Sequence, residues 1–188
     1  MCVRSGLVVD VWWADLRSAD IRLTQLLDAN ENARLQALVV DADRGRFLVG
    51  AALLRAATAA ATGASASSIT IDRTCAECGE PHGAPRVDGT RVSVAHASSL
   101  VLVATAARAV GVDVESVDRG GDVEQWVADE AIFKTGARGE PVVTVQLSVP
   151  MPSFHAALAV VGEGESQVVV HDVEESATAL RALLAVTP

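Results

Sequence analysis

The chain has 188 residues, of which 50% are hydrophobic and 21% are charged, a composition typical of a globular domain and not of a disordered chain. Its net charge of −9, from 15 basic and 24 acidic residues, disfavours non-specific binding to nucleic acid or to an anionic membrane. No apolar stretch has the length and purity of a membrane span, and Met1–Asp20 lacks the core of an export signal. With only three cysteines, a disulfide framework is not expected, and we expect a cytoplasmic protein.

The first 63 residues are predicted to form one strand followed by helices. Alternating β-formers predict a strand over Leu7–Trp13. A helical segment is expected over Arg17–Val40, with a break near Asn30. A stronger helix follows, with Asp43 as its N-cap and Gly63 just past its end.

The rest of the chain mixes strands and helices in no fixed order. The predicted strands are Ile69–Arg73, Arg91–Ala95, Leu100–Ala106, Val110–Glu115, Val142–Val149, Phe154–Val161 and Gln167–His171. The predicted helices are Val123–Gly136 and Glu174–Val186, and Cys75–Asp88 is a loop rich in Gly, Pro and Cys. Short links favour antiparallel pairing, so the pattern predicts the α+β class and not a doubly wound parallel sheet.

Two carboxylates stand two residues apart in the predicted strand Val110–Glu115. On a strand, Asp113 and Glu115 face the same side, while Val112 and Val114 face the core. Adjacent carboxylates repel unless they are solvated or bridged by a cation, and their oxygens suit Mg²⁺. The alternative is an edge strand with a solvated polar face.

Glu130 and Lys134 stand four residues apart on a predicted helix. Lys134 is the only lysine in the chain, beside 14 arginines. In one interpretation Glu130 is a third metal ligand or a general base, and Lys134 is a point charge for a phosphate. The alternative is an ordinary i, i+4 surface ion pair.

Two further sets of residues carry weaker signals. Two residues could contact phosphate: Arg46, near the start of the second helix, and His96, at a strand end. The alternative is that Arg46 is simply solvated and that His96 is structural. Cys75, Cys78 and His82 could supply three zinc ligands, whereas a structural zinc site needs four. We therefore expect a metal-free loop here, with a small zinc-binding interaction module as the alternative.

In chain order, these motifs resemble a known family. The series reads Asp43-Arg44-x-Arg46-Phe47, then His82-Gly83-Ala84-Pro85, Val92-Ser-Val-Ala95-His96-Ala97, Gly111-Val-Asp113-Val-Glu115 and Trp126-x-x-x-Glu130-Ala-x-x-Lys134. It is similar to the 4′-phosphopantetheinyl transferases of the surfactin-synthetase-activating type, from about Asp41 to Gly136.

The resemblance implies a transferase that moves the 4′-phosphopantetheine arm of coenzyme A to a serine of an acyl or peptidyl carrier protein domain. Such domains serve fatty acid, polyketide and nonribosomal peptide biosynthesis, and the reaction is Mg²⁺-dependent and releases adenosine 3′,5′-bisphosphate. The implied fold is an α+β pseudo-dimer of two similar halves, here residues 1–109 and 110–188, with coenzyme A between them. We expect a monomer.

The resemblance also implies roles for residues at matching positions. Asp113, Glu115 and Glu130 would hold Mg²⁺, and Glu130 would act as the base toward the serine. Lys134 would contact the diphosphate, and Arg46 and His96 would contact the nucleotide phosphates.

The chain departs from the family pattern at three places. Ala95 stands where the family has serine, and Ala84 stands where it has lysine, so we expect Arg86 to supply the missing basic contact to coenzyme A. Only ten residues separate Glu115 from Trp126, a shorter link than the family's. The alternative function is therefore a shortened, non-catalytic relative that binds coenzyme A or a protein partner.

Overall fold

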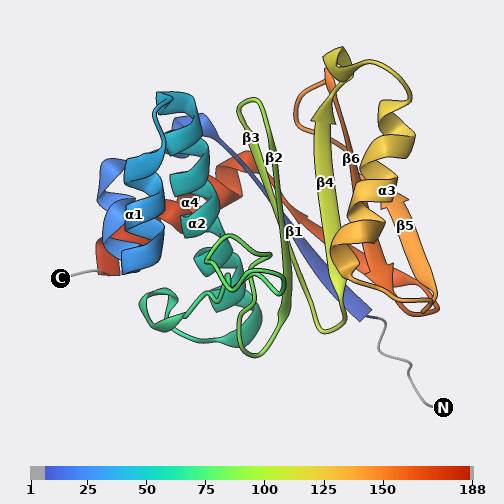
Figure 1. Ribbon diagram of the computed structural model, residues 1–188, viewed down its shortest axis with the longest axis horizontal. Helices are drawn as coiled ribbons and strands as arrows, with labels where there is room; N and C mark the ends of the chain where they lie inside the picture. Colours follow the sequence, from blue (N-terminus) through green and yellow to red (C-terminus); the bar gives the residue numbers. More distant parts are fainter. Residues whose placement is uncertain (1–6, 187–188) are drawn as a thin grey trace.

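The computed structural model describes residues 7–186, which form four layers in the order helices, sheet, sheet, helix (Figure 1). The first sheet has the strand order β2-β3-β1-β7 and the second has the order β4-β6-β5. The strands are β1 Leu7–Asp15, β2 Arg91–Ala97, β3 Leu100–Ala106, β4 Val110–Ser116, β5 Val142–Gln146, β6 Phe154–Val161 and β7 Ser166–His171. The helices are α1 Ala29–Ala37, α2 Asp41–Thr62, α3 Val123–Thr135 and α4 Val173–Val186. The α+β class is confirmed.

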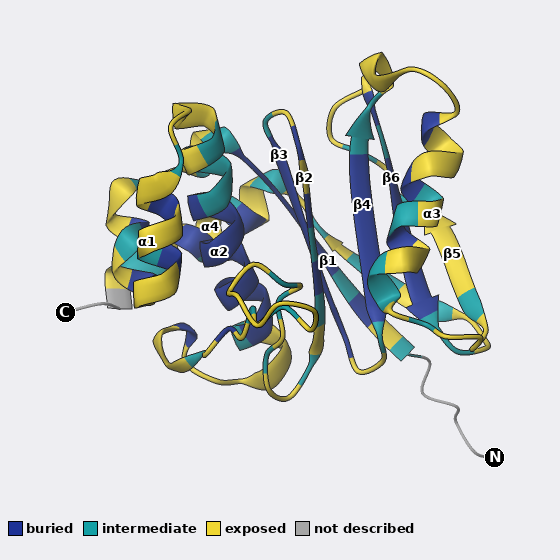
Figure 2. Cartoon of the chain, viewed as in Figure 1, coloured by how far each residue is buried: buried dark blue, intermediate teal, exposed yellow. Residues whose placement is uncertain are grey.

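The two sheets bury one hydrophobic core between them. Apolar side chains of β1, β2 and β3 meet those of β4 and β6 there, including Trp13, Leu102, Val112 and Leu158. The edge strands β2 and β4 also approach each other, and the backbone N–H of Val112 donates to the Ser93 hydroxyl at 3.0 Å. The burial pattern in Figure 2 follows this arrangement, with β4 buried along most of its length and β5 exposed.

The outer face of the first sheet is covered by α2, with α1 and α4 beside it (Figure 1). The 22-residue α2 is rich in alanine and leucine, buries Leu53 and Leu54 and ends at Gly63 in the left-handed conformation. A buried ion pair joins it to α1, since Arg55 Nη2 lies 2.6 Å from Glu31 Oε2. Within residues 7–186, no helix combines the length and the apolar character that a membrane crossing needs.

The outer face of the second sheet is covered by α3, which packs on β4 and β6 through Val127 and Ala131. The helix can come this close because Gly111 has no side chain. A Cβ atom at that position would lie 1.9 Å from the Ala131 carbonyl oxygen. Gly111 therefore sets the distance between the helix and the strand.

Several predicted elements differ in the structure. The segment Arg17–Val40 is not one broken helix, because Asp20 and Asp28 cap short turns that divide it into 3₁₀ helices at Leu16–Ser18 and Ile21–Leu26 and then α1. Asp43 is not an N-cap: α2 begins two residues earlier, and Asp43 instead pairs with Arg46 within the first turns. The strand predicted at Ile69–Arg73 is reduced to a single bridge between Asp72 and Arg86.

After β6 the chain crosses from the second sheet back to the first, where β7 is an edge strand. It pairs in parallel with β1, although the short links favoured antiparallel pairing throughout. A hydrogen bond of 2.9 Å between His171 Nε2 and Asp10 Oδ1 holds it, and the His171 ring stacks on Trp12 at 3.6 Å. The expected boundary after residue 109 separates β1–β3 from β4–β6, but β7 and α4 return to the first sheet.

The close approach at Gly111 leads to a testable expectation. The Gly111→Ala substitution should destabilise the protein by about 3 kcal/mol, because the added methyl group overlaps rigid backbone of α3. Urea denaturation measures the change. In the matched control Gly50→Ala, the new Cβ lies 3.7 Å from Val101, an ordinary contact, and α2 gains helix propensity. Equal stability of Gly111→Ala and the wild type would contradict the proposed packing constraint.

Candidate functional site

The candidate site lies where α3 packs on β4. Alternation along β4 directs Val112 and Val114 into the core between the sheets and directs Asp113 and Glu115 to the α3 side, as the spacing predicts. Asp113 is only 8% exposed, whereas Glu115 lies at the rim of the contact. The predicted shared face of the two carboxylates is therefore confirmed.

Lys134 reaches from the last turn of α3 to this face. Its Nζ donates to Asp113 Oδ1 at 2.6 Å and to the Val112 carbonyl oxygen at 3.2 Å. Within residues 7–186, Lys134 forms its ion pair with Asp113 and not with Glu130. The alternative interpretation, an i, i+4 surface ion pair between Glu130 and Lys134, is therefore wrong. Lys134 instead links the helix to the strand.

Burial and the positive charge of Lys134 shift the pKa of Asp113 in opposite directions. Burial raises the pKa of its carboxyl group, and the hydrogen bond and positive charge of Lys134 lower it. The negative charges of Glu130 and Glu115 raise the pKa further. Three carboxylates and one ammonium group therefore share one electrostatic environment between β4 and α3.

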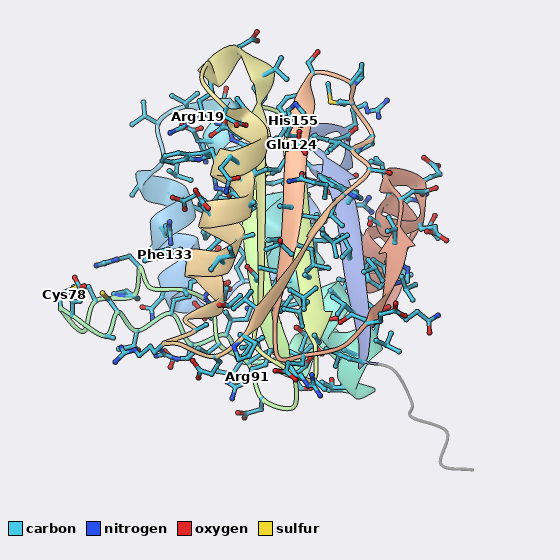
Figure 3. The ribbon with its side chains drawn as sticks, turned by 90° about the vertical axis from the view of Figure 1, so that its right-hand side faces the viewer. Cys78, Arg91, Arg119, Glu124, Phe133 and His155 are labelled. Atoms are coloured by element: carbon cyan, nitrogen blue, oxygen red, sulfur yellow. The ribbon has the colours of Figure 1, made fainter. Side chains whose placement is uncertain are left out.

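Glu115 is held by an arginine that sequence reasoning did not single out. Arg119 Nη1 lies 3.4 Å from Glu115 Oε2, and its guanidinium lies 3.7 Å from the centroid of the Trp126 ring. In Figure 3, Arg119 and His155 are labelled at the same end of the second sheet. The sequence signal that could have indicated this ion pair is the spacing of four residues between Glu115 and Arg119.

The donor atoms of Asp113, Glu115 and Glu130 are neighbours but not a compact ligand set. In the described part of the chain, the only triad of His, Cys, Asp or Glu donors within 4.8 Å of one another is Cys75, Cys78 and His82. Lys134 and Arg119 engage two of the three carboxylates. The oxygen donors fit Mg²⁺ by chemistry, and binding it would require Lys134 to release Asp113.

Arg46 and His96 lie near each other at the end of β2. Arg46 Nη1 donates to the Ser98 carbonyl oxygen at 2.5 Å, and Asp43 pairs with its other nitrogen. Partial burial of the His96 ring lowers the pKa of this histidine, and the positive charges of Arg46 and Lys134 lower it further. Burial and the two nearby cations therefore both favour the neutral form of the His96 ring.

A pocket of about 170 Å³ opens beside Lys134. Arg86 and Arg91 also line it, and so does Ala84. Arg86 is held in place by Asp72, with 2.7 Å between its Nη2 and the Oδ2 of the acid. Arg91, labelled in Figure 3, lies at the start of β2, and no local sequence pattern marks it as a pocket residue, because it reaches the pocket only through the fold.

Ala95 does not face this pocket. It is 4% exposed and packs in the core between the sheets, on the same side of β2 as Ser93 and Ala97. A serine at this position would therefore place its hydroxyl in an apolar core and not in the pocket.

The sequence was compared with known proteins. No protein-family model matches it, and no curated protein gives a significant match.

The pair of Lys134 and Asp113 generates a prediction about pH. The Lys134→Met substitution should destabilise the fold by about 2 kcal/mol at neutral pH, because it leaves a largely buried carboxylate without its counter-charge. Burial, Glu130 and Glu115 then all raise the pKa of Asp113. When the carboxyl pKa is higher in the folded state than in the unfolded state, protonation of Asp113 favours folding. The loss of stability caused by Lys134→Met should therefore shrink as the pH falls toward the pKa of Asp113 in the unfolded chain.

Urea denaturation from neutral pH down to the pKa of an unfolded aspartate measures how the loss of stability depends on pH. A ¹³C NMR titration measures the pKa of Asp113 itself. The matched control is Arg22→Met, which breaks an exposed pair with Asp20 and should leave stability unchanged. A destabilisation by Lys134→Met that is constant with pH would contradict the assigned role of Asp113.

Proposed function

We propose that this protein transfers the 4′-phosphopantetheine arm of coenzyme A to a serine hydroxyl of an acyl or peptidyl carrier protein. The single observation that carries the proposal is the position of Lys134. Its ammonium group lies 2.6 Å from Asp113 in the carboxylate cluster, and the same residue lines the pocket that Arg86 and Arg91 also line. A carboxylate cluster beside a cationic pocket suits the attack of a hydroxyl on a phosphate ester.

The pocket supports binding of a polyanionic substrate. Arg86, Arg91 and Lys134 supply three positive charges in a chain whose net charge is −9. This concentration of cations matches the diphosphate and the 3′-phosphate of coenzyme A. Arg46 and His96 do not line this pocket but lie toward the other end of β2, and they would contact the nucleotide phosphates.

The reaction follows from the charges. Glu130 takes the proton of the carrier serine, and the serine oxygen forms a bond to the phosphorus that bears the pantetheine arm. The bond from that phosphorus to the bridging oxygen breaks, and adenosine 3′,5′-bisphosphate leaves. Lys134 stabilises the negative charge that builds on the leaving phosphate. In the described part of the chain no hydrogen bond involves the Glu130 side chain, which leaves its carboxylate free to act as the base.

Asp113, Glu115 and Glu130 would hold Mg²⁺ in this proposal. A bound Mg²⁺ supplies positive charge to the diphosphate oxygens. Lys134 would then exchange its contact with Asp113 for one with phosphate. The neighbouring carboxylates and the partly exposed pairing of Lys134 with Asp113 support this exchange.

The proposal extends to the fold and the partner. The arrangement of two sheets, each covered by helix, is compatible with the expected pseudo-dimer of two similar halves. The partner would be a carrier protein domain, and the protein would act as a cytoplasmic monomer. No role for nucleic acid or for a membrane is proposed.

Transfer can be tested directly. The protein is incubated with coenzyme A, Mg²⁺ and a panel of apo-carrier domains, and mass spectrometry detects the phosphopantetheine added to the carrier. Glu130→Gln should lower the rate by about 100-fold or more, because it removes the base. Glu124→Gln, an exposed carboxylate on the same helix, is the matched control and should leave the rate unchanged (Figure 3).

The outcomes separate the two functions considered. Transfer that depends on Mg²⁺ and on Glu130 supports the enzyme. Binding of coenzyme A without transfer to any carrier favours the non-catalytic relative, for which the short connection from β4 to α3 is the structural argument. Absence of both binding and transfer rejects the proposal.

A charge added to the pocket should strengthen coenzyme A binding. Ala84 is exposed and lines the pocket, so Ala84→Lys should lower the dissociation constant about tenfold, the effect of one charge-assisted hydrogen bond. Ala64→Lys adds the same charge at an exposed position outside the pocket and should have no such effect. Isothermal titration calorimetry measures both, and equal affinities for the two variants would place the ligand elsewhere.

A further inference from the structure

The loop between η3, the 3₁₀ helix Ala66–Ser68, and β2 carries the two cysteines that the structure describes. It projects away from the sheets, as the position of Cys78 in Figure 3 shows. Its base is closed by the bridge between Asp72 and Arg86. At its tip the chain turns back on itself, since Cys75 N–H donates to the Glu80 carbonyl oxygen at 2.8 Å and Gly79 N–H donates to the Cys75 carbonyl oxygen at 3.0 Å.

This turn gathers three metal-binding side chains. The sulfur atoms of Cys75 and Cys78 and a ring nitrogen of His82 all lie within 4.8 Å of one another. Cys78 Sγ lies 3.0 Å from His82 Nε2, and both cysteines are free thiols. The sequence alone favours a metal-free loop, because three ligands are fewer than a structural zinc site needs.

We propose that this loop binds a zinc ion through Cys75, Cys78 and His82. Ligand atoms on a tetrahedral zinc ion, with Zn–S near 2.3 Å and Zn–N near 2.0 Å, lie about 3.6 Å apart. The three donors already lie close to this spacing, and a small opening of the Cys78 and His82 contact completes it. Within residues 7–186 no fourth His, Cys, Asp or Glu donor joins the group, so the fourth position is taken by water.

The chemistry of the donors selects the metal. Thiolate and imidazole ligands in a tetrahedral arrangement favour zinc over Mg²⁺ or Ca²⁺, which take oxygen ligands. The backbone N–H groups of Cys78 and Glu77 hydrogen bond to the Cys75 sulfur and so hold it within the group of three donors.

The zinc site would fix one wall of the pocket. The segment that follows His82 carries Ala84, Pro85 and Arg86, all of which line the pocket. Gly83 packs tightly against the other arm of the loop, with its N–H 2.6 Å from the Arg73 carbonyl oxygen. The zinc site stands on its own residues and does not depend on the proposed transferase activity.

The test is the metal content of the full chain purified under reducing conditions. The wild type should contain about one equivalent of zinc, and Co²⁺ in its place should give thiolate charge-transfer absorption. Cys75→Ser combined with Cys78→Ser should lower the bound zinc at least tenfold. His82→Ala should weaken zinc binding, whereas the matched control His155→Ala, which lies on β6 outside the loop, should not.

Each other outcome overturns the zinc site. Wild-type protein without bound zinc that also fails to take up added Zn²⁺ would exclude it. A Cys75–Cys78 disulfide that persists in reducing buffer would assign the pair to redox chemistry instead. Full zinc retention by the double cysteine variant would place the metal at other residues. Circular dichroism of each variant confirms that it is folded.

Discussion

The packing of α3 against β4 at Gly111 is the constraint on which the candidate site depends. A side chain at this position would collide with the Ala131 backbone, so the strand and the helix approach closely only because the residue is glycine. The close approach brings Lys134 within hydrogen-bond distance of Asp113 across the interface. The ion pair compensates for the burial of the carboxylate, and Glu130 and Glu115 contribute their charges to the same space. A packing requirement thus determines the electrostatics of the site.

The distribution of charge supports a polyanionic ligand despite the acidic chain. A net charge of −9 repels polyanions at long range, whereas Arg86, Arg91 and Lys134 act at short range on a ligand inside the pocket. Two of these cations already form ion pairs with neighbouring acids: Arg86 pairs with Asp72, and Lys134 pairs with Asp113. A ligand must therefore compete with these acids, so binding depends on several phosphate contacts made together.

Much of the fold could be predicted from the sequence. The sequence predicted β1, β3, β4, β6, α3 and α4 close to their observed positions. Prediction failed where local polar contacts compete with the helix, as Asp20 and Asp28 do between β1 and α2. It also failed for the parallel pairing of β7 with β1, because partners so distant in sequence leave no local signal.

For the site, the sequence by itself determined which chemical groups are present and which of them share a face. The spacing of Asp113 and Glu115 required a common side of the strand, and the single lysine drew attention to Lys134. Only the tertiary structure decided that Lys134 binds Asp113, that Ala95 faces the core, and that Arg91 joins the pocket. It also gathered the three donors of the cysteine loop. The physical reason is that periodicity assigns a side chain to a face of its own element, whereas the packing of elements distant in sequence decides what that face meets.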